Sequence, residues 1–173
     1  MANNIIKFKG HDIGKSLQEN KSETIIKEIF SLANAKGCKI IYPQDIVVAE
    51  NLNGKPQVKE INEIAQNEMI LDIGPKTIEI IENLIDESNT ILWNGPAGYF
   101  ENPHFANGSI KIAKKIIQNN LAKKIYAVAG GGDTVSLINS LNGINNFNFV
   151  STAGGAFLEY LEGKELPGIK ALN

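Results

Sequence analysis

Short apolar runs rich in β-branched residues alternate along the chain with longer stretches whose apolar residues recur at helical spacing. Such alternation predicts βα units and a parallel sheet flanked by helices. The expected strands cover residues 39–42, 45–49, 69–72, 90–93, 124–129 and 148–151. The expected helices cover residues 23–36, 75–87, 105–119, 134–141 and 155–161. The polar stretch 50–67 is expected to be an excursion between strands, so the sequence predicts one α/β domain.

The first long helix has clear boundaries in the sequence. Ser22 can cap its start, and Gly37 can end it. Its apolar residues recur every three to four positions, which predicts one buried face. That face consists of Ile25, Ile26, Ile29, Phe30 and Ala33.

Length and composition narrow the possible classes of protein. With 173 residues, 43% of them hydrophobic, and a net charge of −2, the chain can form a globular core and is not a strongly basic nucleic-acid binder. No apolar run reaches the roughly 18–20 residues that span a bilayer, and the start does not resemble a signal peptide. We therefore expect a cytoplasmic protein with no membrane or nucleic-acid partner. Cys38 is the only cysteine, which excludes an internal disulfide, and we expect it to be buried.

All 17 basic residues are lysines, and the sequence has no arginine. Arginine often binds carboxylates and phosphates through its planar fork of donors. An anion site in this chain must therefore use backbone N–H groups, lysines or a metal ion. The alternative explanation is codon drift in an AT-rich genome, which would carry no functional meaning.

The most informative segment is Gly130-Gly131-Gly132-Asp133-Thr134, which follows an apolar strand and precedes a helix. Consecutive glycines leave backbone N–H groups uncovered, and a helix N-terminus attracts anions. Asp133 can face a magnesium ion carried by phosphates, and Thr134 can offer its hydroxyl to a phosphate oxygen. The alternative is a tight turn in which Asp133 merely caps the helix.

Two further loops follow apolar strands. Thr152-Ala153-Gly154-Gly155-Ala156 again leads into a helix, so two helix N-termini would meet beyond neighbouring strand ends, where open α/β sheets bind ligands. The other loop runs from Asn94-Gly95-Pro96 to Glu101. Asn94 supplies hydrogen-bond donors, and a carboxylate such as Glu101 can accept hydrogen bonds from ribose hydroxyls. The alternative is a packed turn with a surface glutamate.

Several motifs, in order, resemble phosphoglycerate kinases. They are Asp72-Ile73-Gly74-Pro75-Lys76-Thr77, then Trp93-Asn94-Gly95-Pro96 with Glu101, then Gly130 to Thr134, and finally Ser151 to Ala156 with Leu161 to Gly168. The resemblance covers essentially the whole chain. It implies a Rossmann-like, three-layer αβα domain that binds the nucleotide. The implied reaction is phosphoryl transfer between 1,3-bisphosphoglycerate and Mg-ADP, which forms ATP in glycolysis.

The resemblance also implies roles for individual residues. Gly131, Gly132, Asp133 and Thr134 would hold the phosphates of ADP or ATP, and Asp133 would face Mg²⁺. Asn94, Gly95 and Pro96 would border the triphosphate and adenine, and Glu101 would contact the ribose. Gly154 and Gly155 would face the phosphoryl group in transfer and are the implied catalytic positions.

The sequence departs from the family pattern at its beginning. The N-terminal lobe, whose arginines hold the acceptor, has no counterpart, and Met1-Ala2-Asn3 resembles an internal segment of the nucleotide lobe. We therefore expect residues 1–173 to be a partial nucleotide-binding domain, truncated at its N-terminal end and inactive alone. A separate chain can carry the missing lobe. The alternative hypothesis is a stand-alone nucleotide- or phosphate-binding module with a regulatory or structural role.

Overall fold

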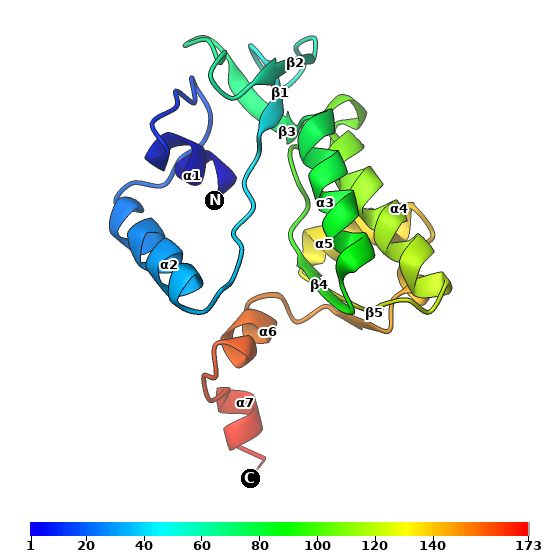
Figure 1. The fold of residues 1–173 in the computed structure, drawn as a ribbon. Helices are drawn as coiled ribbons and strands as arrows, with labels where there is room; N and C mark the ends of the chain where they lie inside the picture. Colours follow the sequence, from blue (N-terminus) through cyan, green and yellow to red (C-terminus); the bar gives the residue numbers. More distant parts are fainter. Residues whose placement is uncertain (173) are drawn as a thin grey trace. The chain divides into compact units, whose positions relative to one another are not determined.

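A computed structural model describes residues 1–172 and divides them into two compact units. Unit 1 consists of Met1–Ile80 and Ala97–Gly108, and unit 2 consists of Ile81–Pro96 and the chain from Ser109 onward. The helices and strands, with two short 3-10 turns, are α1 (Ala2–Phe8), α2 (Glu23–Ala35), β1 (Asp45–Ala49), β2 (Gln57–Glu60), β3 (Met69–Ile73), α3 (Pro75–Glu87), β4 (Thr90–Asn94), η1 (Pro103–Phe105), α4 (Asn107–Leu121), β5 (Tyr126–Gly130), α5 (Gly132–Ser140), η2 (Ile144–Asn146), β6 (Phe149–Ser151), α6 (Gly154–Leu161) and α7 (Pro167–Lys170) (Figure 1).

Unit 1 contains an antiparallel sheet in the order β2-β1-β3. The central strand β1 is a continuous apolar run after Asp45, as expected for a strand with neighbours on both sides and both faces covered. Its Ile46 and Val48 are fully buried and pack with Ile6 of α1. The strands predicted at 45–49 and 69–72 are confirmed, but they pair antiparallel to each other.

Helix α2 is confirmed over nearly its predicted length, but its predicted buried face is wrong in part. Ile26 is buried, whereas Ile25 and Ile29 are 59% and 44% exposed. The helix contacts α1 through stacking of Phe30 on Phe8, with ring centroids 6.0 Å apart. This contact lies on the side of the helix that carries Ile26 and Phe30, so the neighbouring apolar residues remain uncovered in the described chain.

The start of α3 is held by a residue far away in the sequence. The Asp45 carboxylate on β1 accepts hydrogen bonds from the backbone N–H groups of Lys76 (2.9 Å) and Thr77 (2.8 Å). The Thr77 hydroxyl lies 2.7 Å from the same carboxylate. A Cβ at Gly74 would lie 2.3 Å from Asp45, so only glycine leaves room for this cap. Because a helix N-terminus has unpaired N–H groups, Asp45 fixes the first turn of α3 to β1 within unit 1.

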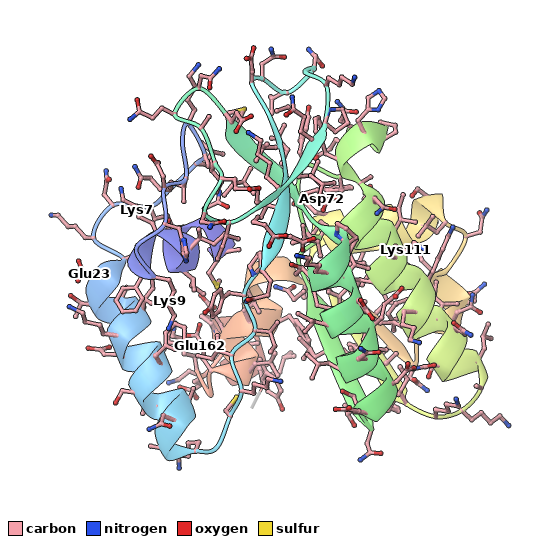
Figure 2. The ribbon with its side chains drawn as sticks, turned by 45° about the horizontal axis from the view of Figure 1, so that its top comes forward. Lys7, Lys9, Glu23, Asp72, Lys111 and Glu162 are labelled. Atoms are coloured by element: carbon pink, nitrogen blue, oxygen red, sulfur yellow. The ribbon has the colours of Figure 1, made fainter. Side chains whose placement is uncertain are left out.

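Asp72 on β3 plays the same part for α4 (Figure 2). Its carboxylate accepts hydrogen bonds from the N–H groups of Gly108 and Ile73, both at 2.8 Å. Gly98 and Gly108 pack so closely that a Cβ at either position would lie within 2.8 Å of Asp72. Asp72 therefore anchors the segment Ala97–Gly108 within unit 1.

Unit 2 contains a parallel sheet in the order β4-β5-β6, flanked by helices as the sequence predicts. Alternate side chains point to opposite faces of its strands. One face carries Trp93, Ala127 and Ala129, which are all buried. The other face carries Leu92, Tyr126 and Phe149, which are 45–53% exposed. The alternation confirms the strands predicted at 90–93, 124–129 and 148–151.

Three further expectations differ from the structure. Residues 39–42 do not form a strand; they approach β1 as extended chain without ladder partners among the described residues. The polar stretch 50–67 contains β2, which hairpin pairing with β1 stabilises despite its weak apolar pattern. Cys38 is exposed rather than buried because it follows the end of α2 in this irregular connection.

The environment of Asp72 predicts a pH-dependent stability. Burial raises the pKa of its carboxyl from 3.8 to about 6, against the opposing effect of the N–H groups that it accepts. The protonated carboxyl therefore stabilises the fold below about pH 3.8, and this contribution is lost as the pH rises through about 6. Asp72→Asn should reduce the fall in unfolding free energy between these pH values, measured by urea unfolding. An identical pH profile in both proteins would contradict this assignment.

Candidate functional site

The three loops singled out in the sequence begin side by side. In the parallel sheet, Asn94 of β4 is in register with Gly130 of β5, and Gly130 is in register with Ser151 of β6. Each of these residues is the last of its strand, so the three chains leave the sheet at the same edge. This edge is the carboxyl end of a parallel sheet, where α/β proteins commonly bind ligands.

The glycines after β5 are required by close contacts. A Cβ at Gly131 would lie 2.8 Å from Asn94 Oδ1, and a Cβ at Gly130 would lie 2.6 Å from the ring of Phe157. Gly131 also has a φ of +89°, which side chains rarely adopt. These contacts bring the β4 and β5 loops together with α6.

Helix α5 begins with an uncovered backbone. A Cβ at Gly132 would meet no described atom within 4 Å, and both Gly132 and Asp133 are exposed. No described side chain caps the helix at Gly131. The alternative in which Asp133 is the N-cap is therefore wrong, because Gly131 occupies that position and Asp133 lies in the first turn. The free N–H groups and the helix dipole make this turn suited to an anion.

Thr134 is fully buried beneath this turn. Its Oγ1 accepts a hydrogen bond from the N–H of Gly95 at 2.7 Å. The hydroxyl therefore ties the β4 loop to α5, while its own proton remains able to donate. The predicted bond to a phosphate oxygen stays a prediction.

Helix α6 repeats the arrangement after β6. Ser151 is buried, and its Oγ accepts a hydrogen bond from the N–H of Ala153 at 3.3 Å. Gly154 has a φ of +47°, and a Cβ at Gly155 would meet no described atom within 4 Å. Two helices of unit 2 thus begin with exposed glycine turns directly after neighbouring strands.

The two remaining candidate residues, Pro96 and Glu101, have weaker structural support as members of this site. Pro96 follows Gly95 and is half-buried. Glu101 is exposed and belongs to unit 1, in the segment that Asp72 anchors. The contacts of Ser151 and Phe157 with these loops do not follow from the predicted pattern. The signal for Ser151 was present, since a polar residue ends an apolar strand, but nothing local marked Phe157.

Asp133 is the one acidic residue in the first turn of α5. It forms no ion pair with any lysine of residues 1–172. Mg²⁺ in nucleotide sites is commonly held by one or two carboxylates together with phosphate oxygens and water. A single unpaired carboxylate beside an anion-binding turn fits such an ion.

Comparisons with known proteins agree on one family. The phosphoglycerate kinase family model matches residues 1–164. A phosphoglycerate kinase of Zymomonas mobilis is 45% identical over 99% of this chain, and one of Sphingopyxis alaskensis is 42% identical over the same share. The chain spans 44% of the length of each of these relatives.

Solved structures give the same result. The structure of phosphoglycerate kinase from Coxiella burnetii matches with a TM-score of 0.91 and 39% identity, over 99% of this chain and 44% of that one. The crystal structure of the enzyme from Pyrococcus horikoshii matches with a TM-score of 0.72 and 28% identity, over 99% of this chain and 42% of that one.

The bond from Gly95 to Thr134 is open to a direct test. Thr134→Val keeps the shape of the side chain but leaves the Gly95 N–H without its acceptor. We expect a loss of about 1 kcal/mol in unfolding free energy and faster hydrogen exchange at the Gly95 amide, measured by NMR. Thr134→Ser is the matched control, because it keeps the hydroxyl and should keep the exchange protection. Equal exchange in the valine and serine variants would refute the assignment.

Proposed function

Because the chain belongs to the phosphoglycerate kinase family, we propose that it supplies the nucleotide-binding part of such a kinase. In this proposal the loops after β4, β5 and β6 hold the phosphates of Mg-ADP or Mg-ATP. The observation that carries the proposal is the register of Asn94, Gly130 and Ser151, which starts all three loops at one sheet edge.

The chemistry of these loops supports phosphate binding without arginine. Phosphoryl transfer depends on positioning and on neutralising charge rather than on covalent catalysis. The free N–H groups at the start of α5, between Gly132 and Thr134, would hold the nucleotide phosphates. The N–H groups at Gly154 and Gly155 would face the phosphoryl group in transfer.

Side chains complete the proposed site. Asp133 would hold Mg²⁺, which supplies charge neutralisation on the phosphate oxygens when bound. Asn94, Gly95 and Pro96 would border the triphosphate and adenine. The role of Glu101 in contacting the ribose rests on the family resemblance alone.

The full reaction needs a second substrate. We propose that the parent activity is transfer between 1,3-bisphosphoglycerate and Mg-ADP, and that this chain by itself binds nucleotide without turning it over. Positioning two substrates contributes about 7–11 kcal/mol to such reactions, and residues 1–173 contain no arginine that could hold the acceptor. A second chain carrying the acceptor site is a proposed partner, and catalysis in a cytoplasmic, glycolytic setting is part of the same proposal.

The second candidate is a nucleotide- or phosphate-binding module with a regulatory or structural role. It shares the exposed turns at Gly132 and Gly155 and requires no acceptor site. To distinguish the two candidate functions, the purified chain is mixed with a polypeptide that carries the acceptor lobe. Turnover of 3-phosphoglycerate by this mixture is then measured in a coupled assay. Turnover in the mixture supports the proposal that the chain is the nucleotide-binding part of a kinase. Nucleotide binding without turnover supports a regulatory or structural binding module.

Nucleotide binding is tested by titration calorimetry with ADP in the presence of Mg²⁺ and again in EDTA. Asp133→Asn should weaken binding about tenfold with Mg²⁺, because the ion loses its carboxylate, and should have little effect in EDTA. Glu79→Gln is the control with the same change of charge, because Glu79 on α3 is exposed and forms no ion pair within residues 1–172. No ADP binding by the unaltered chain, or an equal effect of both variants, would exclude the proposed site.

A further inference from the structure

Unit 1 contains a cavity that the proposed function does not use. Its volume is about 390 Å³, within the range of small-molecule sites. It lies where α1, the loop 18–22 and the start of α2 meet. Its lining includes Asn4, Lys7 and Phe8 from α1, Lys21 from the loop, and Glu23 and Ile26 from α2.

A buried polar side chain faces this cavity with one atom unpaired. Asn4 is only 7% exposed, and its Oδ1 accepts the N–H of Glu19 at 3.1 Å. This bond fixes the orientation of the amide, because only the oxygen can accept. The Nδ2 group then has no acceptor among residues 1–172, and because none of their buried side-chain nitrogens or oxygens lacks a partner, this group is accessible to solvent. Since Asn4 lines the cavity, a ligand there can accept from Nδ2.

The charges around the cavity favour an anion. Lys7 donates one hydrogen bond to Gln18 Oε1 at 2.5 Å and has two further donors, and Lys21 forms no ion pair within the described chain. Of the two lining glutamates, Glu23 is paired with Lys27 at 2.8 Å, and this bond lowers the pKa of its carboxyl. Glu19 is therefore the single unpaired carboxylate against two lysines.

Helix α2 adds a second source of positive potential. No described side chain caps its start, because the Ser22 hydroxyl donates to the Glu19 carbonyl instead. The N–H groups of its first turn, at Glu23 and Thr24, thus remain available beside the cavity. Figure 2 shows Glu23 at this start of α2 and Lys7 on α1. Phe8 and the buried Ile26 provide an apolar wall.

From these contacts we propose that the cavity is a binding site for a phosphate monoester. The phosphate lies between Asn4 Nδ2, Lys7, Lys21 and the first turn of α2, and the organic part lies against Phe8 and Ile26. This site belongs entirely to unit 1 and does not depend on the loops of the parallel sheet.

The test uses phenyl phosphate as the probe, followed by ¹H–¹⁵N NMR of the whole chain. We expect saturable shifts at the Asn4 side-chain amide and at the Glu23 and Thr24 backbone amides, with a Kd of about 1 mM. Inorganic phosphate should bind more weakly, because it lacks the ring. Absence of saturable shifts at these groups would overturn the proposal, and so would equal shifts with phenol, which carries no phosphate.

Two variants test the proposed contacts of Asn4 and Lys21 with the phosphate. Asn4→Asp keeps the oxygen that Glu19 needs but replaces the donor with a charged acceptor, so it should abolish binding while an unchanged melting temperature confirms folding. Lys21→Gln should weaken binding about fivefold, whereas Lys36→Gln, with the same charge change beyond the far end of α2, should not. Unaltered binding in both Asn4→Asp and Lys21→Gln would overturn the proposal. The amides of Gly132 to Thr134 report on the proposed nucleotide site, which is tested with Mg-ADP. The failure of one site can therefore be told apart from the failure of the other.

Discussion

The parallel pairing of β4, β5 and β6 is the constraint on which the candidate site depends. It aligns Asn94, Gly130 and Ser151 at one edge, and this alignment decides where the following loops start. The glycines then allow contacts that no larger residue permits, as between Gly131 and Asn94. The resulting turns expose backbone N–H groups, which are suited to anions in a chain that has no arginine. The register of the sheet and the close contacts of the glycines thus together place the exposed N–H groups at this edge.

Unit 1 is organised by two buried carboxylates. Asp45 and Asp72 lie on neighbouring strands, and each accepts the first N–H groups of a helix that follows much later in the chain. Within unit 1, caps of this kind hold the first residues of α3 and α4 to the strands that carry the two carboxylates. Placing a carboxylate in a buried environment has an energetic cost, which is visible in the raised pKa of Asp72. The same bonds give the segment that carries Glu101 a fixed anchor.

The sequence predicted what depends on local pattern. The strand-glycine-helix order at Gly130 to Thr134 and the boundaries of α3 follow from residue types within a few positions. It did not predict the caps by Asp45 and Asp72, because the partners lie more than 30 residues apart. Nor did it predict β2, whose apolar pattern is weak and whose pairing comes from β1. The exposure of Ile25 depends on which neighbours reach α2, and periodicity marks an apolar face without showing what covers it.

The central claim is that the loops after β5 and β6 act as one phosphate site. Its most direct test is a ¹H–¹⁵N NMR titration of the chain with Mg-ADP. We expect the amides of Gly132, Asp133, Gly154 and Gly155 to shift together with a single affinity. Shifts confined to one of the two loops, or different affinities at the two loops, would contradict the claim.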